Sequence, residues 1–251
     1  MRLKDRVAIV TGGGIGIGGA YALGLAREGA KVLIADINDE GISNTLATIK
    51  NKAGEAVGVH TDASDEAMTL RMAKEALDQF GRIDVLVNNA ALFTAIPLRE
   101  WDEIEVEEWD RIMAVNLRGP FLCCKAVAPA MKQQTYGKII NISSASIMGG
   151  NARRAHYVTS KAGLIGFTRS LARALGPYNI CVNSLLPGGT ASEGAIAAYG
   201  PQQFEHAPSN RPIPRVERPE DLVGTVVFLA SSDSDFITGQ AIVVDGGVYM
   251  Y

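Results

Sequence analysis

The stretch VAIVTGGGIGIGG, residues 7–19, decides the fold of this chain. Residues 7–10 are apolar and mostly β-branched, which predicts a buried strand. The glycines that follow permit a tight turn, and a helix is predicted after them, to about Glu28. Backbone N–H groups at a helix N-terminus attract phosphate, so this strand–turn–helix order favours dinucleotide binding over a purely structural turn.

Two registers fit the glycine loop. Gly14, Gly16 and Gly19 satisfy the pattern G-x-G-x-x-G, whereas Gly12, Gly16 and Gly18 satisfy T-G-x-x-x-G-x-G. The sequence leaves both open. The loop residues that we expect to contact a cofactor are Gly12, Gly16 and Ile17.

Short apolar runs alternate with helix-length segments along the rest of the chain, which predicts βαβ units and a parallel sheet. Further strands are expected at 31–35, 56–60, 83–87, 138–142, 180–185 and 241–244. Helices are expected at 40–52, 66–80, 106–133, 154–175 and 220–230, with Pro120 and Pro129 bending or interrupting the third of these. We therefore predict an α/β fold: a doubly wound, Rossmann-like parallel sheet of about seven strands with helices on both faces, in a single domain of residues 1–251.

Residues 188–218 show neither the apolar pattern of a strand nor that of a helix. They are rich in Gly, Pro and Ala and follow a predicted strand. A segment this long without regular structure is usually functional, so we predict a substrate lid. A surface insertion without a role is the alternative.

Composition excludes several classes of partner. The net charge of −3 gives no basis for binding nucleic acid or a membrane surface. No apolar run approaches the ~20 residues of a spanning helix, and the N-terminus lacks the layout of a signal peptide. Cys123, Cys124 and Cys181 have neither disulfide nor metal-ligand spacing, so no metal is expected and a cytoplasmic location is predicted.

The sequence YVTSK, residues 157–161, carries the chemistry. On a helix, Tyr157 and Lys161 stand one turn apart on the same face. A nearby ammonium group favours phenolate, so the pKa of Tyr157 is expected to fall from ~10 toward neutrality, as acid/base work on an alcohol or carbonyl requires. Taken alone, the Tyr157–Lys161 spacing has an alternative explanation: the two could be ordinary surface residues on a helix.

Asp36 ends the second predicted strand, about twenty residues beyond the glycine loop. A carboxylate at this point can bind the adenosine ribose hydroxyls and would repel a 2′-phosphate. The neighbouring Ile37 and Asn38 carry no positive charge, so NAD is predicted over NADP. The alternative is that Asp36 only caps the next helix.

Together these motifs resemble those of the short-chain dehydrogenase/reductase family over essentially all 251 residues. The matching positions, in the family's order, are 11–18, Asp36, Asp62, 88–90, Asn116, Ser144, Tyr157, Lys161, 187–188, 238–240 and 245–247.

The resemblance implies roles for four residues. Tyr157 would be the catalytic acid/base, and Ser144 would hydrogen-bond the substrate oxygen. Lys161 would hold the nicotinamide ribose and lower the pKa of Tyr157, while Asn116 would support a water-linked proton relay. Further cofactor contacts implied are Asp62 at the adenine, its neighbour Ala63, Asn89, Pro187, Thr190 near the carboxamide, and Ser192. The chain departs from the family's pattern at Ala91, where glycine is usual. The family is usually homotetrameric.

The substrate pocket is expected to contain Phe93, Ser146, Met148, Arg154 and Tyr199. The wider surroundings, with Leu92, Phe93, Ile147, Met148, Tyr199 and Phe204, are mostly apolar, which hints at a hydrophobic or aromatic substrate, although ordinary loop packing explains them equally well. Arg154 could pair with a substrate carboxylate or phosphate. A helix start that faces solvent or a neighbouring subunit is the favoured reading of Arg153 and Arg154. His156 should point away from the catalytic face.

The predicted function is NAD-dependent interconversion of a secondary alcohol and its ketone. A 3-oxoacyl-carrier-protein-type reductase shares most of the motifs, although Asp36 argues against its usual NADPH. A dinucleotide-binding protein that has lost catalysis is a further alternative, which the presence of Asn116, Ser144, Tyr157 and Lys161 disfavours.

Overall fold

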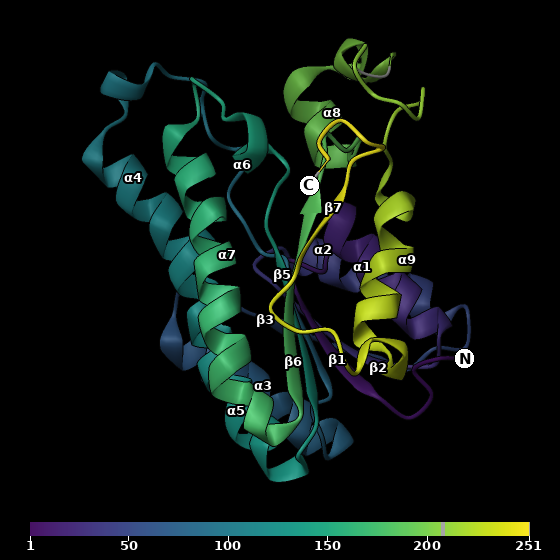
Figure 1. The fold of residues 1–251 in the computed structure, drawn as a ribbon. Helices are drawn as coiled ribbons and strands as arrows, with labels where there is room; N and C mark the ends of the chain where they lie inside the picture. Colours follow the sequence, from purple (N-terminus) through teal and green to yellow (C-terminus); the bar gives the residue numbers. More distant parts are fainter. Residues whose placement is uncertain (207–208, 251) are drawn as a thin grey trace.

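A seven-stranded, all-parallel sheet with the strand order β3-β2-β1-β4-β5-β6-β7 forms the centre of the molecule (Figure 1). The structure is a computed structural model that describes residues 1–206 and 209–250. It confirms the predicted doubly wound α/β fold. The strands are β1 (Val7–Thr11), β2 (Lys31–Asp36), β3 (Ala56–His60), β4 (Val85–Asn88), β5 (Gly137–Ile142), β6 (Ile180–Pro187) and β7 (Ala241–Val244).

Helices cover both faces of this sheet (Figure 1). One face carries α1 (Gly16–Arg27), α2 (Asp39–Lys50) and α9 (Pro219–Ala230), and the other carries α3 (Glu66–Phe80), α4 (Val106–Met113), α5 (Gly119–Gln134) and α7 (Ala155–Leu175). Successive strand residues therefore enter different cores: Ala8 and Val10 pack on the α1 side, and Ile9 packs on the α5 side. Burial on both faces explains why the strands read as continuous apolar runs. Among the described residues, none of the helices is both long and apolar enough to span a membrane.

The single helix expected over residues 106–133 is three elements. Between α4 and α5 lies a π-helical segment, η2 (Ala114–Arg118). Pro120 falls in the first turn of α5, where proline is tolerated, and Pro129 lies inside α5. The interruption therefore precedes both prolines, and such π-helical turns often occur at functional sites.

The segment 188–218 contains a helix that the sequence analysis did not predict, α8 (Glu193–Tyr199), followed by a short 3₁₀ turn, η4 (Pro201–Phe204). Ser192 caps α8 by accepting a hydrogen bond from the amide of Ala195 at 3.3 Å. The helix is only seven residues long and lacks a clear apolar period, so its sequence did not predict it. Residues 207 and 208 of this segment lie outside the described residues. Figure 1 shows α8 above the carboxyl end of the sheet.

The remaining elements are short. They are η1 (Trp101–Glu103), α6 (Ser146–Gly149), η3 (Gly176–Tyr178) and η5 (Ser232–Ser234).

Candidate active site

A cavity of about 1240 Å³ opens beyond the carboxyl ends of the strands. This is where ligands bind in doubly wound sheets. All the residues predicted to contact a cofactor line this one cavity: Gly12, Gly16, Ile17, Asp36, Asp62, Ala63, Asn89, Tyr157, Lys161, Pro187, Thr190 and Ser192. Ser144 lines it as well, so the structure joins the nucleotide and acid/base motifs in one space.

The conformation of the glycine loop decides between its two registers. Gly12 and Gly16 have φ values of 61° and 56°, which favour glycine. A Cβ on Gly18 would overlap the carbonyl oxygen of Gly12, whereas a Cβ on Gly19 would meet nothing closer than 3.5 Å. The glycines that the backbone requires are therefore those of the pattern T-G-x-x-x-G-x-G.

Asn89 ties the end of β4 to this loop. Its Nδ2 donates to the carbonyl oxygens of Thr11 at 3.1 Å and Gly12 at 3.0 Å. Its amide donates to the hydroxyl of Thr11 at 3.0 Å. These bonds hold the start of the glycine loop in place against the end of β4.

Asp36 points both carboxylate oxygens at backbone amides on the rim of the cavity. Its Oδ2 accepts from Gly14 at 2.9 Å and its Oδ1 from Asn38 at 3.0 Å. The cap of α2 is Asn38, whose side chain accepts from Gly41 at 3.0 Å. Asp36 therefore is not the helix cap, and its carboxylate lines the cavity.

At the far end of the cavity, beyond β3, Asp62 is held in the same way. Its Oδ1 accepts from the amide and the hydroxyl of Ser64 at 2.8 and 2.7 Å. Asp36 and Asp62 are the acidic members of the described lining, and both lie at this end.

Tyr157 and Lys161 stand in the first two turns of α7, as their spacing predicted. The Lys161 ammonium lies 5.9 Å from the centroid of the Tyr157 ring and donates to the carbonyl oxygen of Ile142 at 2.7 Å. Ser144 follows β5, and its hydroxyl is 2.9 Å from that of Ser146. The residues predicted to carry the acid/base chemistry thus come from the end of β5 and the start of α7.

The pKa of Tyr157 differs from the sequence-based expectation. Burial raises the pKa of this phenol to about 12, while a hydrogen bond with Ser144 and the positive charge of Arg154 oppose the rise. Lys161 is itself buried, and this lowers its pKa to about 7. Burial therefore outweighs the neighbouring cations at Tyr157 in this structure, and desolvation also weakens the hold of Lys161 on its own proton.

Asn116 is fully buried in η2 and does not line the cavity. Its Oδ1 accepts from the amide of Leu92 at 2.7 Å, and its Nδ2 donates to the carbonyl of Leu92 at 3.1 Å and the hydroxyl of Ser160 at 3.3 Å. Asn116 therefore joins the loop after β4 to α7. The π-helical turn η2 places the carboxamide of Asn116 between Leu92 and Ser160.

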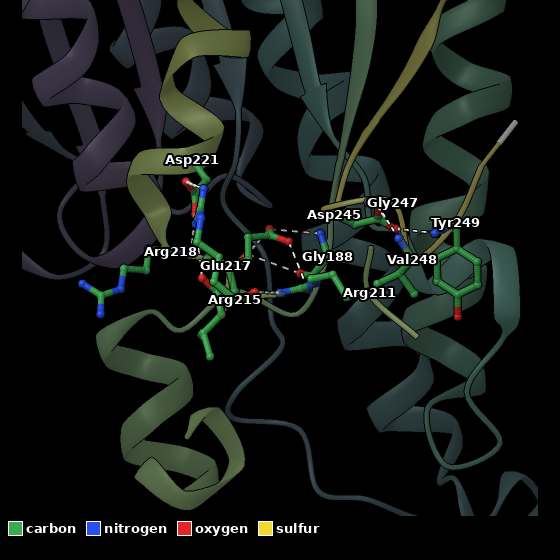
Figure 2. Close-up of polar contacts among 12 residues, drawn as sticks. Gly188, Arg211, Arg215, Glu217, Arg218, Asp221, Asp245, Gly247, Val248 and Tyr249 are labelled. Atoms are coloured by element: carbon green, nitrogen blue, oxygen red, sulfur yellow. Dashed lines mark hydrogen bonds and ion pairs between the residues drawn. The ribbon is translucent and has the colours of Figure 1, made fainter. Parts of the chain in front are cut away.

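Glu217 is a residue that the sequence analysis missed (Figure 2). Its buried carboxylate accepts from the Thr190 hydroxyl at 2.7 Å and the Gly188 amide at 3.2 Å, and the guanidinium of Arg211 lies 3.4 Å away. Burial raises the pKa of Glu217 despite these partners. Glu217 thereby holds both ends of the segment 188–218 together at the cavity wall.

A second carboxylate, Asp245, fixes the chain on the other side of Gly188 (Figure 2). It accepts hydrogen bonds from the amides of Gly247, Val248 and Tyr249 at 2.9 to 3.1 Å. The sequence Asp-Gly-Gly at 245–247 signalled this turn. No comparable pattern surrounds Glu217.

Three of the predicted pocket residues, Phe93, Arg154 and Tyr199, meet at the other end of the cavity. The Phe93 ring lies 4.9 Å from that of Tyr157 and 6.0 Å from that of Tyr199, between centroids. Ser146 and Met148 are not among the residues that line the cavity. Ser146 contacts Ser144 instead.

Arg154 is only 3% exposed, so the favoured reading of a solvent-facing residue is wrong for it. Arg153, by contrast, is exposed. His156 is buried outside the cavity, where its Nε2 contacts Glu108 at 2.8 Å and its Nδ1 accepts from the amide of Tyr157 at 2.9 Å.

Comparisons with known proteins cover nearly the whole chain. A family model described as "Enoyl-(Acyl carrier protein) reductase" matches residues 13–249. The chain is 39% identical over 249 residues to (2S)-[(R)-hydroxy(phenyl)methyl]succinyl-CoA dehydrogenase subunit BbsD of Thauera aromatica, covering 98% of each chain. It is 36% identical over 249 residues to the 3-oxoacyl-acyl-carrier-protein reductase FabG of Thermotoga maritima, covering 99% of each. Among solved structures, levodione reductase matches with a TM-score of 0.90 and 30% identity, over 98% of each chain.

Proposed function

The chain belongs to the short-chain dehydrogenase/reductase family, and on this premise we propose that it is an NAD-dependent oxidoreductase that interconverts a secondary alcohol and its ketone. The observation that carries the proposal is the shared cavity. Asp36 and the glycine loop line one end of it, and Ser144, Tyr157 and Lys161 line the middle. A nucleotide and an alcohol carbon can meet there.

The residues of this chain fit the nicotinamide dinucleotide that the family uses. The backbone at Gly12 and Gly18 leaves no room for a Cβ, so the loop can approach a pyrophosphate closely. When bound, the nicotinamide supplies the hydride chemistry. The protein supplies position and proton transfer.

In the direction of oxidation, the Tyr157 phenolate takes the hydroxyl proton of the alcohol. Ser144 hydrogen-bonds the same oxygen and steadies it as it becomes a carbonyl. Lys161 adjoins the Tyr157 ring and would bind the nicotinamide ribose. Asn116 acts by positioning, since its bonds run to Leu92 and Ser160.

The preference for NAD rests on Asp36. Its carboxylate is fixed by Gly14 and Asn38 and would bind the ribose hydroxyls, while its charge disfavours a 2′-phosphate. The test is the rate of NADH and NADPH formation across secondary alcohols, polyols and hydroxy acids. Turnover with NADP alone would reject this assignment.

A second candidate is reduction of a 3-oxoacyl thioester. It is favoured by the family model and by the FabG relative, whose names describe acyl-carrier-protein reductases. Reduction of acetoacetyl-CoA, followed with NADH and NADPH, separates the two. Faster turnover of this thioester than of any simple ketone would replace the first proposal with the second.

We further propose that residues 188–218 act as a lid. Its two ends meet at Thr190 and Glu217, while Tyr199 and Phe204 from its middle line the cavity. A movement of α8 and η4 relative to these joined ends would open or close the substrate end of the cavity.

We also propose a homotetramer, as in the family. Phe121 of α5 is 47% exposed and packs edge-on against Phe167 of α7 at 6.3 Å, which leaves an apolar area on these helices. Light scattering coupled to size-exclusion chromatography gives the mass directly. A monomer at micromolar concentration would reject this proposal.

A further inference from the structure

Arg154 is a buried cation surrounded by neutral groups. Its Nη1 donates to the carbonyl oxygen of Phe93 at 2.9 Å, and its Nη2 donates to the hydroxyl of Tyr199. Its guanidinium carbon lies 4.4 Å from the Phe93 ring centroid and 5.4 Å from that of Tyr199. Over residues 1–206 and 209–250, no carboxylate forms an ion pair with it.

Neutral oxygens and aromatic faces compensate a buried charge only in part. Glu108, which contacts the nearby residue His156 at 2.8 Å, pairs with Arg99 at 3.1 Å. A guanidinium that stays charged at all relevant pH values therefore keeps an unbalanced positive charge in this wall.

That charge faces the reaction site. The Phe93 ring packs against both residues: its centroid lies 4.4 Å from the guanidinium carbon of Arg154 and 4.9 Å from the ring centroid of Tyr157. The electrostatic effect of Arg154 on the phenol of Tyr157 agrees with this proximity. An anion bound at Arg154 would thus belong to the molecule whose alcohol carbon lies at Tyr157.

The charges that line the cavity are sorted along its length. Within the described lining, the acids are Asp36 and Asp62 at the nucleotide end, and the cations are Lys161 in the middle, Arg154 at the substrate end, and Arg111. Apolar residues line the cavity as well, among them Leu92, Phe93 and Phe204. A single buried guanidinium beside apolar walls suits a single negative charge on a largely carbon skeleton.

We propose that Arg154 binds a carboxylate of the substrate, so that the enzyme acts on hydroxy acids and the corresponding oxo acids. This inference rests on the proposed alcohol–ketone chemistry and names its substrate class. The planar guanidinium can offer a carboxylate two parallel N–H donors. The carboxylate takes the place of the Tyr199 hydroxyl, which is a weaker, neutral acceptor on the lid.

The test compares hydroxy acids with their own methyl esters, in series with the hydroxyl at carbon 2, 3 or 4 and with alkyl or aryl substituents. The quantity measured is the ratio of kcat/KM for acid over ester. Because acid and ester use the same Tyr157, an effect of Arg154 through the phenol cancels in this ratio. We expect one series in which wild-type enzyme prefers the acid.

Three variants give the comparison its control. Arg154→Gln should lower the acid/ester ratio by about 10- to 100-fold, mainly through KM for the acid. Arg154→Lys keeps the charge but loses the planar pair of donors, so its acid/ester ratio should lie between those of wild type and Arg154→Gln. Arg153→Gln, the exposed neighbour, should leave the ratio unchanged.

An unchanged ratio in both Arg154 variants overturns the proposal, as does an equal loss for acids and esters, which would assign Arg154 to holding Tyr199 and the lid. Should Arg154→Gln fail to fold, Arg154→Lys alone must still lower the ratio. Turnover of neutral alcohols without acid preference rejects the carboxylate site and leaves the proposed function standing. If no alcohol is oxidised, calorimetric binding of oxo acids to wild type and Arg154→Lys decides the site: equal affinity overturns it.

Discussion

The two ends of the cavity are held by different kinds of interaction. At the nucleotide end, Gly12, Asp36 and Asn89 are fixed by turns and by hydrogen bonds to backbone atoms of adjacent strand ends. At the substrate end, Arg154 reaches from the start of α7 to Phe93 and Tyr199, which lie 61 and 45 residues away along the chain. The first arrangement depends on the path of the backbone. The second depends on long side chains, which can be substituted without altering the path of the sheet.

This difference has a functional meaning. A cofactor shared by many enzymes needs a constant shape, which the ends of parallel strands provide. A substrate differs from enzyme to enzyme, and loops on a rigid scaffold can change without disturbing the sheet. Tyr157 lies where the two ends meet, and substitutions on either side of it test the division.

The largest effect is expected at that meeting point. Tyr157→Phe keeps the ring that packs against Phe93 but removes the hydroxyl that we propose transfers the proton. We expect kcat to fall by about 10² to 10⁴-fold, with NADH binding retained by fluorescence titration. Tyr199→Phe is the matched control, since it removes a hydroxyl on the lid and should keep most of the activity. Retained turnover in Tyr157→Phe would reject its role.

The pH dependence should have opposite directions for the two reactions. Burial raises the pKa of Tyr157, so phenolate is scarce at neutral pH. Oxidation of an alcohol needs phenolate, and kcat/KM should rise up to tenfold per pH unit into the alkaline range. Reduction needs the phenol and should stay constant there. Profiles from about pH 6 to about pH 10 check this for both directions.

Arg154→Gln sharpens the same measurement. Removing the positive charge that opposes the rise in the Tyr157 pKa should move the oxidation profile for a neutral alcohol to higher pH. Arg153→Gln, which is exposed, should leave the profile in place. A profile that stays in place in both variants would show that the two ends are electrostatically independent.

A smaller effect is expected at the nucleotide end alone. Asp36→Ala removes the carboxylate fixed by Gly14 and Asn38, and the preference for NAD over NADP should fall by about 10- to 100-fold. Asp39→Ala, an exposed residue of the next helix, is the control. The ratio of the two kcat/KM values is the measurement, and an unchanged ratio in Asp36→Ala would contradict the assignment.

The smallest effect should be on stability. Glu217→Ala leaves the guanidinium of Arg211 buried without its carboxylate, which should lower the free energy of unfolding by about 1–3 kcal/mol. Thermal denaturation should then show a Tm several degrees lower. Glu193→Ala, exposed in α8 of the same segment, should leave Tm unchanged. An equal Tm for Glu217→Ala and wild type would mean that the ends of the segment are held by other contacts.

Most of the nucleotide end could be predicted because its signals are local. A buried strand, a glycine turn and a helix follow one another, and Asp36 stands at the end of the next strand. Even there, the choice between the two glycine registers required backbone φ values and the close approach of Gly18 to Gly12. The π-helical turn at Asn116 and the helix α8 carry no periodic signal. The turn was therefore predicted as part of a longer helix, and α8 was not predicted.

The amino-acid sequence by itself predicted the doubly wound sheet, because apolar periodicity is a property of neighbouring residues. Its resemblance to the family singled out Ser144, Tyr157 and Lys161 as the proposed catalytic residues. Only the tertiary structure decided that Arg154 is buried near Tyr157, that burial raises the pKa of Tyr157, and that Glu217 joins Thr190 to Arg211. Burial and long-range contacts arise from packing of distant segments, and the charge of a side chain acquires its effect from that environment.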